Sequence, residues 1–162
     1  MRIFIAVSFF VLGCLNIYGT DAACCAFCRP EVIESQSVFE TDYCAVLLDY
    51  APRVKGHLLV IPKRHVVKVH DLSPVEWADL FSVIPSVVRV FSEFLYTDDY
   101  IIVEKNGPKA LQEVPHVHFH LIPATGKEWA EIFDITPRRL SSEELEEEQT
   151  LFRSHFSLAE IL

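Results

Sequence analysis

Residues 114–123 read Val-Pro-His-Val-His-Phe-His-Leu-Ile-Pro, so three histidines occupy alternate positions with apolar residues between them. Successive side chains of a β-strand point to opposite faces of the sheet, which predicts that His116, His118 and His120 project from one face. Neighbouring histidines would then lie roughly 6.5–7 Å apart, at about 3.3 Å per residue. Because neutral imidazole packs poorly and three imidazolium groups repel one another, the pattern indicates a functional site on a strand.

Histidine supports several kinds of chemistry at such a site. It attacks phosphorus as a nucleophile, holds a phosphate by hydrogen bonds, donates a proton to a leaving group, or binds a metal. His118 would reach the middle of a pocket, with His120 beside it, and His57 would reach the same ligand if its strand pairs next to this one. The competing hypothesis is a zinc hydrolase in which His116 and His118 are metal ligands. Spacing alone does not separate the two.

The other strand-like segments predict an antiparallel sheet. Residues 37–49 have the pattern of a hairpin, residues 56–62 that of a buried strand ended by proline, and residues 100–104 that of a further strand. Strands, one long helix and then strands again are typical of an α+β fold in which the sheet packs against that helix.

Two helices are expected. Ser73, with a proline and a glutamate in the turn that follows, favours a helix start, and apolar residues at helical spacing continue toward Leu95. Pro85 should kink or interrupt this helix. Ser141 opens a capping box for a C-terminal acidic helix that ends at about Phe156.

Composition limits the classes of partner. A chain of 162 residues with 51% hydrophobic residues fits one domain whose core needs neither disulfides nor metal. The formal net charge of −9 argues against a nucleic-acid partner, because phosphate backbones are bound through Lys and Arg. Much of this charge comes from the glutamates of residues 143–148, so a small anionic ligand is still compatible with the sequence.

The N-terminal segment is treated separately from the fold. Residues 3–12 are apolar apart from one serine and follow a single arginine, which is typical of a signal peptide and too short for a membrane-spanning helix. A mis-assigned start codon would produce a similar extension. We therefore divide the chain into residues 1–22, a domain of residues 23–125, and a C-terminal extension of residues 126–162. Export follows from the first interpretation and a cytoplasmic location from the second.

Three blocks of the chain resemble one known family. His116-Val117-His118-Phe119-His120-Leu121-Ile122 is similar to the signature of alternating histidine and apolar residues in the histidine triad (HIT) family of nucleotide hydrolases and transferases. Residues 56–63 resemble the family's second block, and residues 106–114 resemble the loop before the triad. The resemblance extends from Cys25 to Pro123. It implies a HIT-like fold in which two subunits join their sheets as a homodimer.

The resemblance also implies roles for individual residues. His118 would attack the α-phosphate and form a nucleotidyl-histidine intermediate that water hydrolyses, while His120 and His57 contact the phosphate oxygens. Asp49 would bind the ribose hydroxyls, since a carboxylate accepts from both. The other expected substrate contacts are Asn106, Gln112, Glu113 and His116. Glu113 departs from the family pattern, in which serine or threonine occupies this position.

The substrates implied are purine nucleoside phosphoramidates, acyl-adenylates and dinucleoside polyphosphates, each cleaved to release a nucleoside monophosphate. This chemistry would need no catalytic metal. A non-catalytic nucleotide-binding or scaffold protein is the alternative from a different class, because some members of the family have that use.

Cys25-Ala26-Phe27-Cys28 is a second constellation. Together with His65 and His116 it would complete a tetrahedral Cys₂His₂ zinc site. The spacing resembles the structural zinc site of several bacterial HIT proteins, which would give His116 a structural role. Cys24 is a competing ligand, and export to an oxidising compartment would favour oxidation of the cysteines instead.

Overall fold

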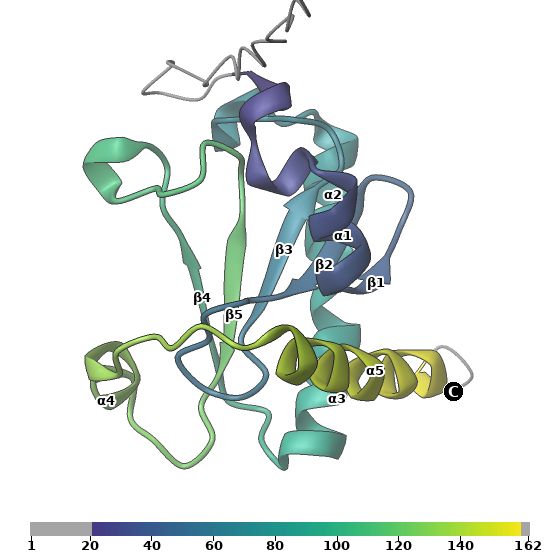
Figure 1. Ribbon diagram of the computed structural model, residues 1–162, viewed down its shortest axis with the longest axis vertical. Helices are drawn as coiled ribbons and strands as arrows, with labels where there is room; N and C mark the ends of the chain where they lie inside the picture. The colour runs from purple at the N-terminus through teal and green to yellow at the C-terminus, as the bar shows by residue number, and fades with distance from the viewer. Residues whose placement is uncertain (1–20, 160–162) are drawn as a thin grey trace, which may run out of the picture.

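The computed structural model describes residues 21–159 and is built around a five-stranded antiparallel sheet (Figure 1). The strands lie side by side in the order β1-β2-β3-β5-β4. Their bounds are β1 Ser37–Glu40, β2 Cys44–Leu48, β3 Leu58–Pro62, β4 Tyr100–Glu104 and β5 Phe119–Pro123. The hairpin and the two further strands predicted from the sequence are confirmed, and so is the α+β class.

Two consecutive helices cover one face of the sheet (Figure 1). Their bounds are α2 Pro74–Ser82 and α3 Ile84–Leu95. A complete capping box starts α2, because the Ser73 hydroxyl accepts from the Glu76 N–H and the Glu76 carboxylate accepts from the Ser73 N–H. The long helix predicted over this region is interrupted at Val83, two residues before Pro85, as expected for a residue that lacks a backbone donor.

Short N-terminal elements cover part of the opposite face. They are the 3₁₀ turns η1 Ala22–Cys24 and η2 Ala26–Cys28, followed by α1 Pro30–Gln36. The side chains of Cys25 and Phe27 are buried there against β2 and β3. The N-terminal turns therefore lie against the sheet face that also carries the histidines.

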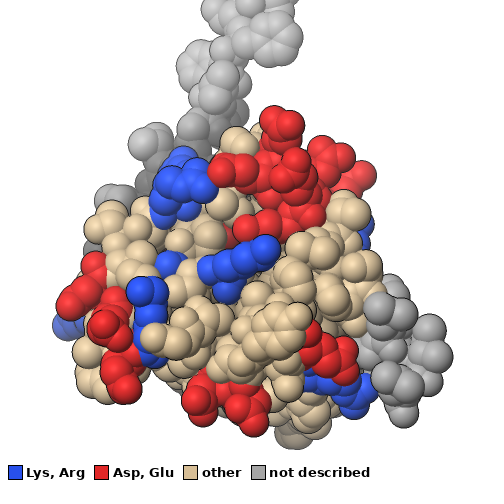
Figure 2. All heavy atoms as spheres, turned by 90° about the horizontal axis from the view of Figure 1, so that it is seen from below, with Lys and Arg blue, Asp and Glu red and all other residues tan. Residues whose placement is uncertain are grey.

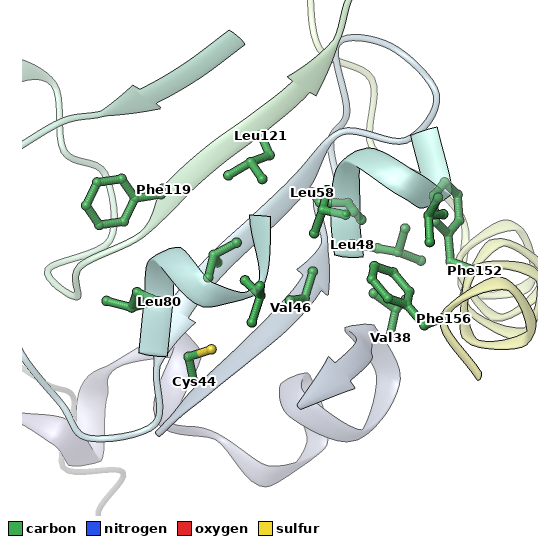
Figure 3. Packing of buried hydrophobic residues seen from close by; sticks show 14 of the residues in the cluster. Val38, Cys44, Val46, Leu48, Leu58, Leu80, Phe119, Leu121, Phe152 and Phe156 are labelled. Atoms are coloured by element: carbon green, nitrogen blue, oxygen red, sulfur yellow. The ribbon is translucent and has the colours of Figure 1, made fainter. Parts of the chain in front are cut away.

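Alternate residues of the central strands belong to two separate apolar layers. Figure 3 shows the layer between the sheet and α2–α3. Its labelled members are Val38, Cys44, Val46, Leu48, Leu58, Leu80, Phe119, Leu121, Phe152 and Phe156. The intervening strand residues, such as Leu47 and Leu59, pack in the other layer with Cys25 and Phe27. Phe119 and Leu121 thus face α2–α3, which leaves His118 and His120 on the opposite face, as the alternation predicts.

The histidine strand is shorter than the sequence pattern predicts. We expected a strand through all three histidines, but β5 begins at Phe119, so His116 and His118 precede it. Pro115 has no N–H for a ladder bond, and the Val117 N–H donates to the carbonyl of Val66 in a loop, 2.6 Å away. The extended segment before β5 still keeps the His118 ring against that of His120, with 5.1 Å between centroids.

The C-terminal segment contains α4 (Trp129–Asp134) and the acidic helix α5 (Ser142–Ala159). The predicted capping box is present, since the Ser141 and Glu144 side chains each accept from the other's backbone N–H. Helix α5 packs on β1, where the Gln149 amide donates to the carbonyl of Ser37, and its Phe152 is fully buried. The acidic helix therefore contributes to the main core.

Charged side chains of both signs are mixed on one face of the molecule (Figure 2). Figure 2 shows one face on which Lys and Arg side chains are scattered between groups of acidic side chains. Within residues 21–159, none of the helices is long and apolar enough to cross a membrane. The signal-type run of residues 3–12 lies outside the described residues.

A buried carboxylate in the first turn of α2 makes the stability of the protein depend on pH. Arg64 forms a bidentate pair with Glu76, with N···O distances of 2.7 and 2.8 Å, and this pair is the main reason that the pKa of Glu76 falls to about 2. The pKa of Glu76 in the folded state lies below its value in the unfolded state. The contribution of the ionised carboxylate to the free energy of unfolding is therefore complete above about pH 5 and is lost as the pH falls toward 2.

We expect Glu76→Gln to lower the free energy of unfolding by about 1–2 kcal/mol at pH 7, allowing for the exposure of Arg64. The difference from the unmodified chain should shrink as the pH falls from 5 to 3. Urea denaturation at pH 7 and at pH 3 measures this difference, with exposed Glu146→Gln as the control. An equal difference at pH 7 and pH 3 would contradict the assignment.

Candidate active site

His57, His118 and His120 meet at one open pocket on the sheet face opposite α2–α3. His57 immediately precedes β3, and its Nε2 lies 2.9 Å from Nδ1 of His120. The pocket is open to solvent and has a cavity volume of about 150 Å³. Its lining residues are Phe27, Asp49, Tyr50, Ala51, Arg53, His57, Leu59, Lys105, Leu111, Glu113, Val114, His118, His120 and Pro137.

The hydrogen bonds of His118 determine its tautomer. Its Nδ1 lies 2.7 Å from the carbonyl oxygen of His116, and a carbonyl only accepts, so Nδ1 carries the proton. The lone pair is then on Nε2, the atom required for nucleophilic attack. The Gln112 amide donates to the same carbonyl at 3.3 Å and to that of Val67 at 3.0 Å, which holds the segment in place. The Phe27 ring stands edge-on to His118, 5.4 Å between centroids.

Asp49 follows β2 and contacts two of the histidines. Its Oδ2 lies 3.4 Å from Nδ1 of His57 and 3.9 Å from Nδ1 of His120. Its Oδ1 accepts from the Ala51 N–H at 2.9 Å, which stabilises the turn after β2. One carboxylate oxygen therefore supports the turn while the other faces the site.

Burial keeps the pocket histidines neutral. Desolvation is the main cause that lowers the pKa of His57, His118 and His120 below the ordinary histidine value. The Asp49 carboxylate opposes this effect at His57 and His118, whereas the positive charge of Lys105 adds to it at all three. Neutral imidazoles near pH 7 provide both lone pairs and N–H donors for a phosphate.

A separate cluster lies behind the pocket, where Cys25, Cys28, His65 and His116 offer ligand atoms within 4.8 Å of one another. The S···N distances are 3.4 Å for Cys25–His116, 3.6 Å for Cys28–His116 and 3.3 Å for Cys28–His65. A tetrahedral zinc ion with Zn–S of about 2.3 Å and Zn–N of about 2.0–2.1 Å requires an S···N edge of roughly 3.6 Å. The four residues fit such an ion.

The second nitrogen of His116 supports this fit. Its Nε2 lies 2.8 Å from the carbonyl oxygen of Pro62, so Nε2 carries the proton and Nδ1 directs its lone pair at the two sulfurs. The cluster includes Cys25 rather than its neighbour Cys24. His116 is fully buried and does not line the pocket.

The remaining predicted contacts divide into two groups. Glu113 lines the pocket. Asn106 and Gln112 lie outside its lining: the Asn106 side chain accepts from the Val69 N–H at 3.3 Å, and Gln112 braces the His116 carbonyl. The structure thus brings five of the predicted residues together at the pocket: Asp49, His57, Glu113, His118 and His120. The side chains of Asn106 and Gln112 instead form hydrogen bonds with backbone groups of the adjoining loops.

Sequence reasoning missed three residues that shape the pocket. The sequence pattern identifies Phe27 only as part of the Cys-x-x-Cys motif and gives no local signal for the role of Arg53. The Arg53 N–H lies 3.3 Å from Nδ1 of His57, and the Arg53 guanidinium donates to the carbonyls of Phe133 and Ile135. The signal for Lys105 was its position one residue after a strand and directly before Asn106.

Sequence comparison finds relatives that are named as nucleotide hydrolases. An adenosine 5'-monophosphoramidase of Schizosaccharomyces pombe is 37% identical over 107 residues, 65% of this chain and 77% of that protein. An asymmetrical bis(5'-nucleosyl)-tetraphosphatase of the same organism is 35% identical over 99 residues, 61% of this chain and 54% of that protein.

Solved structures agree with the sequence relatives. A zinc-bound histidine triad family protein from Mycobacterium smegmatis superposes with a TM-score of 0.67 at 27% identity, over 87% of this chain and 99% of that chain. Residues 30–127 match the HIT domain, which is more than half of the sequence. The chain therefore belongs to the HIT domain family.

Proposed function

We propose that the protein is a nucleotide hydrolase that transfers a nucleotidyl group through His118. The observation that carries this proposal is the Nδ1 hydrogen bond of His118 to the His116 carbonyl, which leaves the Nε2 lone pair in a pocket with two further histidines. The names of two relatives, a phosphoramidase and a dinucleoside tetraphosphatase, support the reaction class. The substrates proposed are purine nucleoside phosphoramidates, acyl-adenylates and dinucleoside polyphosphates.

The reaction has two displacements at the α-phosphorus. In the first, Nε2 of His118 forms a P–N bond while the bond from phosphorus to the leaving group breaks. The leaving group departs with its electron pair, and an amine leaving group also takes a proton from water, which the water molecule that attacks in the second step gives back. In the second, water attacks the same phosphorus, the P–N bond breaks, and a nucleoside monophosphate and neutral His118 are released. Dividing the displacement in this way replaces one difficult step with two easier ones.

The neighbouring groups orient the phosphate. His57 Nδ1 accepts from the Arg53 N–H, so the His57 proton lies on Nε2 and is donated to Nδ1 of His120, 2.9 Å away. His120 then carries its own proton on Nε2 and would donate it to a non-bridging oxygen, while His57 holds the His120 ring in place. The carboxylate of Asp49, beside these two rings, would accept from the ribose hydroxyls. This arrangement stabilises the charge of the transition state with preorganised donors.

The metal cluster has a structural role in this proposal. Cys25, Cys28, His65 and His116 would hold a zinc ion, which supplies a crosslink between the N-terminal turns and the segment before β5. No catalytic step uses it. A zinc hydrolase with His116 and His118 as shared ligands is disfavoured, because no group of metal-ligating atoms within residues 21–159 contains both.

A direct test is release of AMP from adenosine phosphoramidate and diadenosine tetraphosphate by the purified chain. Release from either substrate supports the hydrolase proposal. Tight AMP binding by a folded protein that leaves both substrates intact over hours would favour the alternative of a nucleotide-binding or scaffold protein.

We also propose a homodimer that pairs through β4. Among residues 21–159, this strand pairs only with β5 and forms a sheet edge, whereas the other edge strand, β1, is contacted by α5. Phe81, Tyr100 and Ile102 are exposed at or beside β4 by 42%, 37% and 39%. An apolar patch at an open edge is typical of an interface.

The dimer predicts a mass in solution of about twice 18.5 kDa. Ile102→Lys should convert it to a monomer, because the new charge would be buried unpaired at the pairing edge. Light scattering after gel filtration measures both masses, with exposed Val75→Lys on α2 as a control. A monomeric unmodified chain would contradict the proposal.

A further inference from the structure

Lys105 lies beside the nucleophile, one residue beyond the end of β4. The register pairs Val103 with His120 and Glu104 with Phe119, so Lys105 is next in line opposite His118. Lys105 lies two residues after Val103, and residues two apart in an extended chain share a face of the sheet. Because Val103 is paired with His120, Lys105 lies on the same face as His120. The Lys105 side chain lines the same pocket as His118.

The charge of Lys105 is available for a ligand. No hydrogen bond or ion pair within the described part of the chain engages its ammonium group, although the side chain is half-buried. The other cation in the lining, Arg53, instead uses its guanidinium on the carbonyls of Phe133 and Ile135, at 2.8 and 2.6 Å.

The order of groups across the sheet assigns a direction to the substrate. Asp49 follows β2, His57 precedes β3, His118 precedes β5 and Lys105 follows β4, and these strands are neighbours in the order β2-β3-β5-β4. Adjacent strands lie about 4.8 Å apart. A nucleotide with its ribose at Asp49 and its α-phosphate at the histidines therefore extends its leaving group toward β4 and Lys105.

We propose that Lys105 recognises an anionic leaving group, and that the enzyme consequently prefers dinucleoside polyphosphates to nucleoside phosphoramidates. This inference rests on the proposed nucleotidyl transfer and deepens it by assigning the substrate class. A lysine ammonium is a compact charge with three donors, suited to the oxygens of a phosphate that follows the scissile bond. A leaving ammonia offers no such oxygens.

The contact would act on the step that breaks the P–O bond. With diadenosine tetraphosphate, Nε2 of His118 bonds to the α-phosphorus, the bond to the bridging oxygen breaks, and the electron pair stays on that oxygen of the departing ATP. Water then hydrolyses the adenylyl-histidine to AMP. The ammonium of Lys105 would stabilise the charge that develops on the departing phosphate, an interaction that a phosphoramidate cannot use.

The test compares kcat/KM for diadenosine tetraphosphate and adenosine phosphoramidate in the full chain and in Lys105→Gln. We expect the variant to lose about 10- to 100-fold with the first substrate and less than about 3-fold with the second. Lys105→Arg, which keeps the charge, should retain most of the preference. Lys109→Gln, at an exposed lysine outside the pocket lining, is the matched control and should change neither value.

Each other outcome has a distinct meaning. Equal losses with both substrates would overturn the inference, because Lys105 would then act on the shared α-phosphate or on the histidines. Unchanged values, or an unmodified chain that favours the phosphoramidate, would overturn it as well while leaving nucleotidyl transfer intact. An unmodified chain that releases AMP from neither substrate would overturn the proposed function itself, and this inference with it.

Discussion

His118→Ala is expected to reduce the release of AMP by at least about 10³-fold with every substrate that the protein cleaves. The substitution removes the only nitrogen that is assigned to attack phosphorus, and the covalent route is lost with it. His57 and His120 would still hold the phosphate, so AMP should bind within a few-fold of its normal affinity. Initial rates and calorimetric titration with AMP measure the two effects.

His70→Ala provides the matched control, since this histidine is 72% exposed and lies outside the pocket lining. It should keep full activity. A His118→Ala variant that stays folded and retains more than about a tenth of the activity would refute the role of His118, because no other described group has been assigned to replace it.

Removal of zinc is expected to produce the largest change in stability. A purified chain should contain one zinc ion, and Cys28→Ser should lose it and lower the melting temperature by about 10–20 °C, for a cost on the order of 5 kcal/mol. The reason is that the ion would join three segments that are far apart in sequence, namely η2, the loop after β3 and the segment before β5. Elemental analysis and thermal unfolding measure the outcome.

Cys44→Ala is the control for this substitution, because Cys44 is buried in the other apolar layer and outside the cluster. It should keep one zinc ion per chain. Because no catalytic step uses the ion, loss of zinc should reduce turnover only to the extent that the fold is lost. Full folding with complete loss of activity after chelation would favour a catalytic metal instead.

The sequence predicted most of the fold because its signals are local. Alternation in residues 114–123 placed the histidines on one face, and Ser73 and Ser141 marked helix starts through capping boxes that the structure contains. Pro85 predicted the break between α2 and α3. Each of these features depends on neighbours within a few residues, where spacing and backbone chemistry decide the outcome.

Other features depend on tertiary contacts that no local pattern reports. The start of β5 at Phe119 is set by a bond from Val117 to the loop carbonyl of Val66. Lys105 gains its position from the register of β4 with β5, and Arg53 from its bonds to two carbonyls at the C-terminal end of α4. Such contacts join residues that are many positions apart, so spacing along the chain could not predict them.

The stereochemical course at the α-phosphorus tests the central claim most directly. A dinucleoside polyphosphate with a chiral α-phosphorothioate, hydrolysed in ¹⁸O-labelled water, yields adenosine phosphorothioate whose configuration can be determined. Two successive in-line displacements, first by Nε2 of His118 and then by water, predict net retention. Net inversion would show a single direct attack by water and would contradict the nucleotidyl-histidine intermediate.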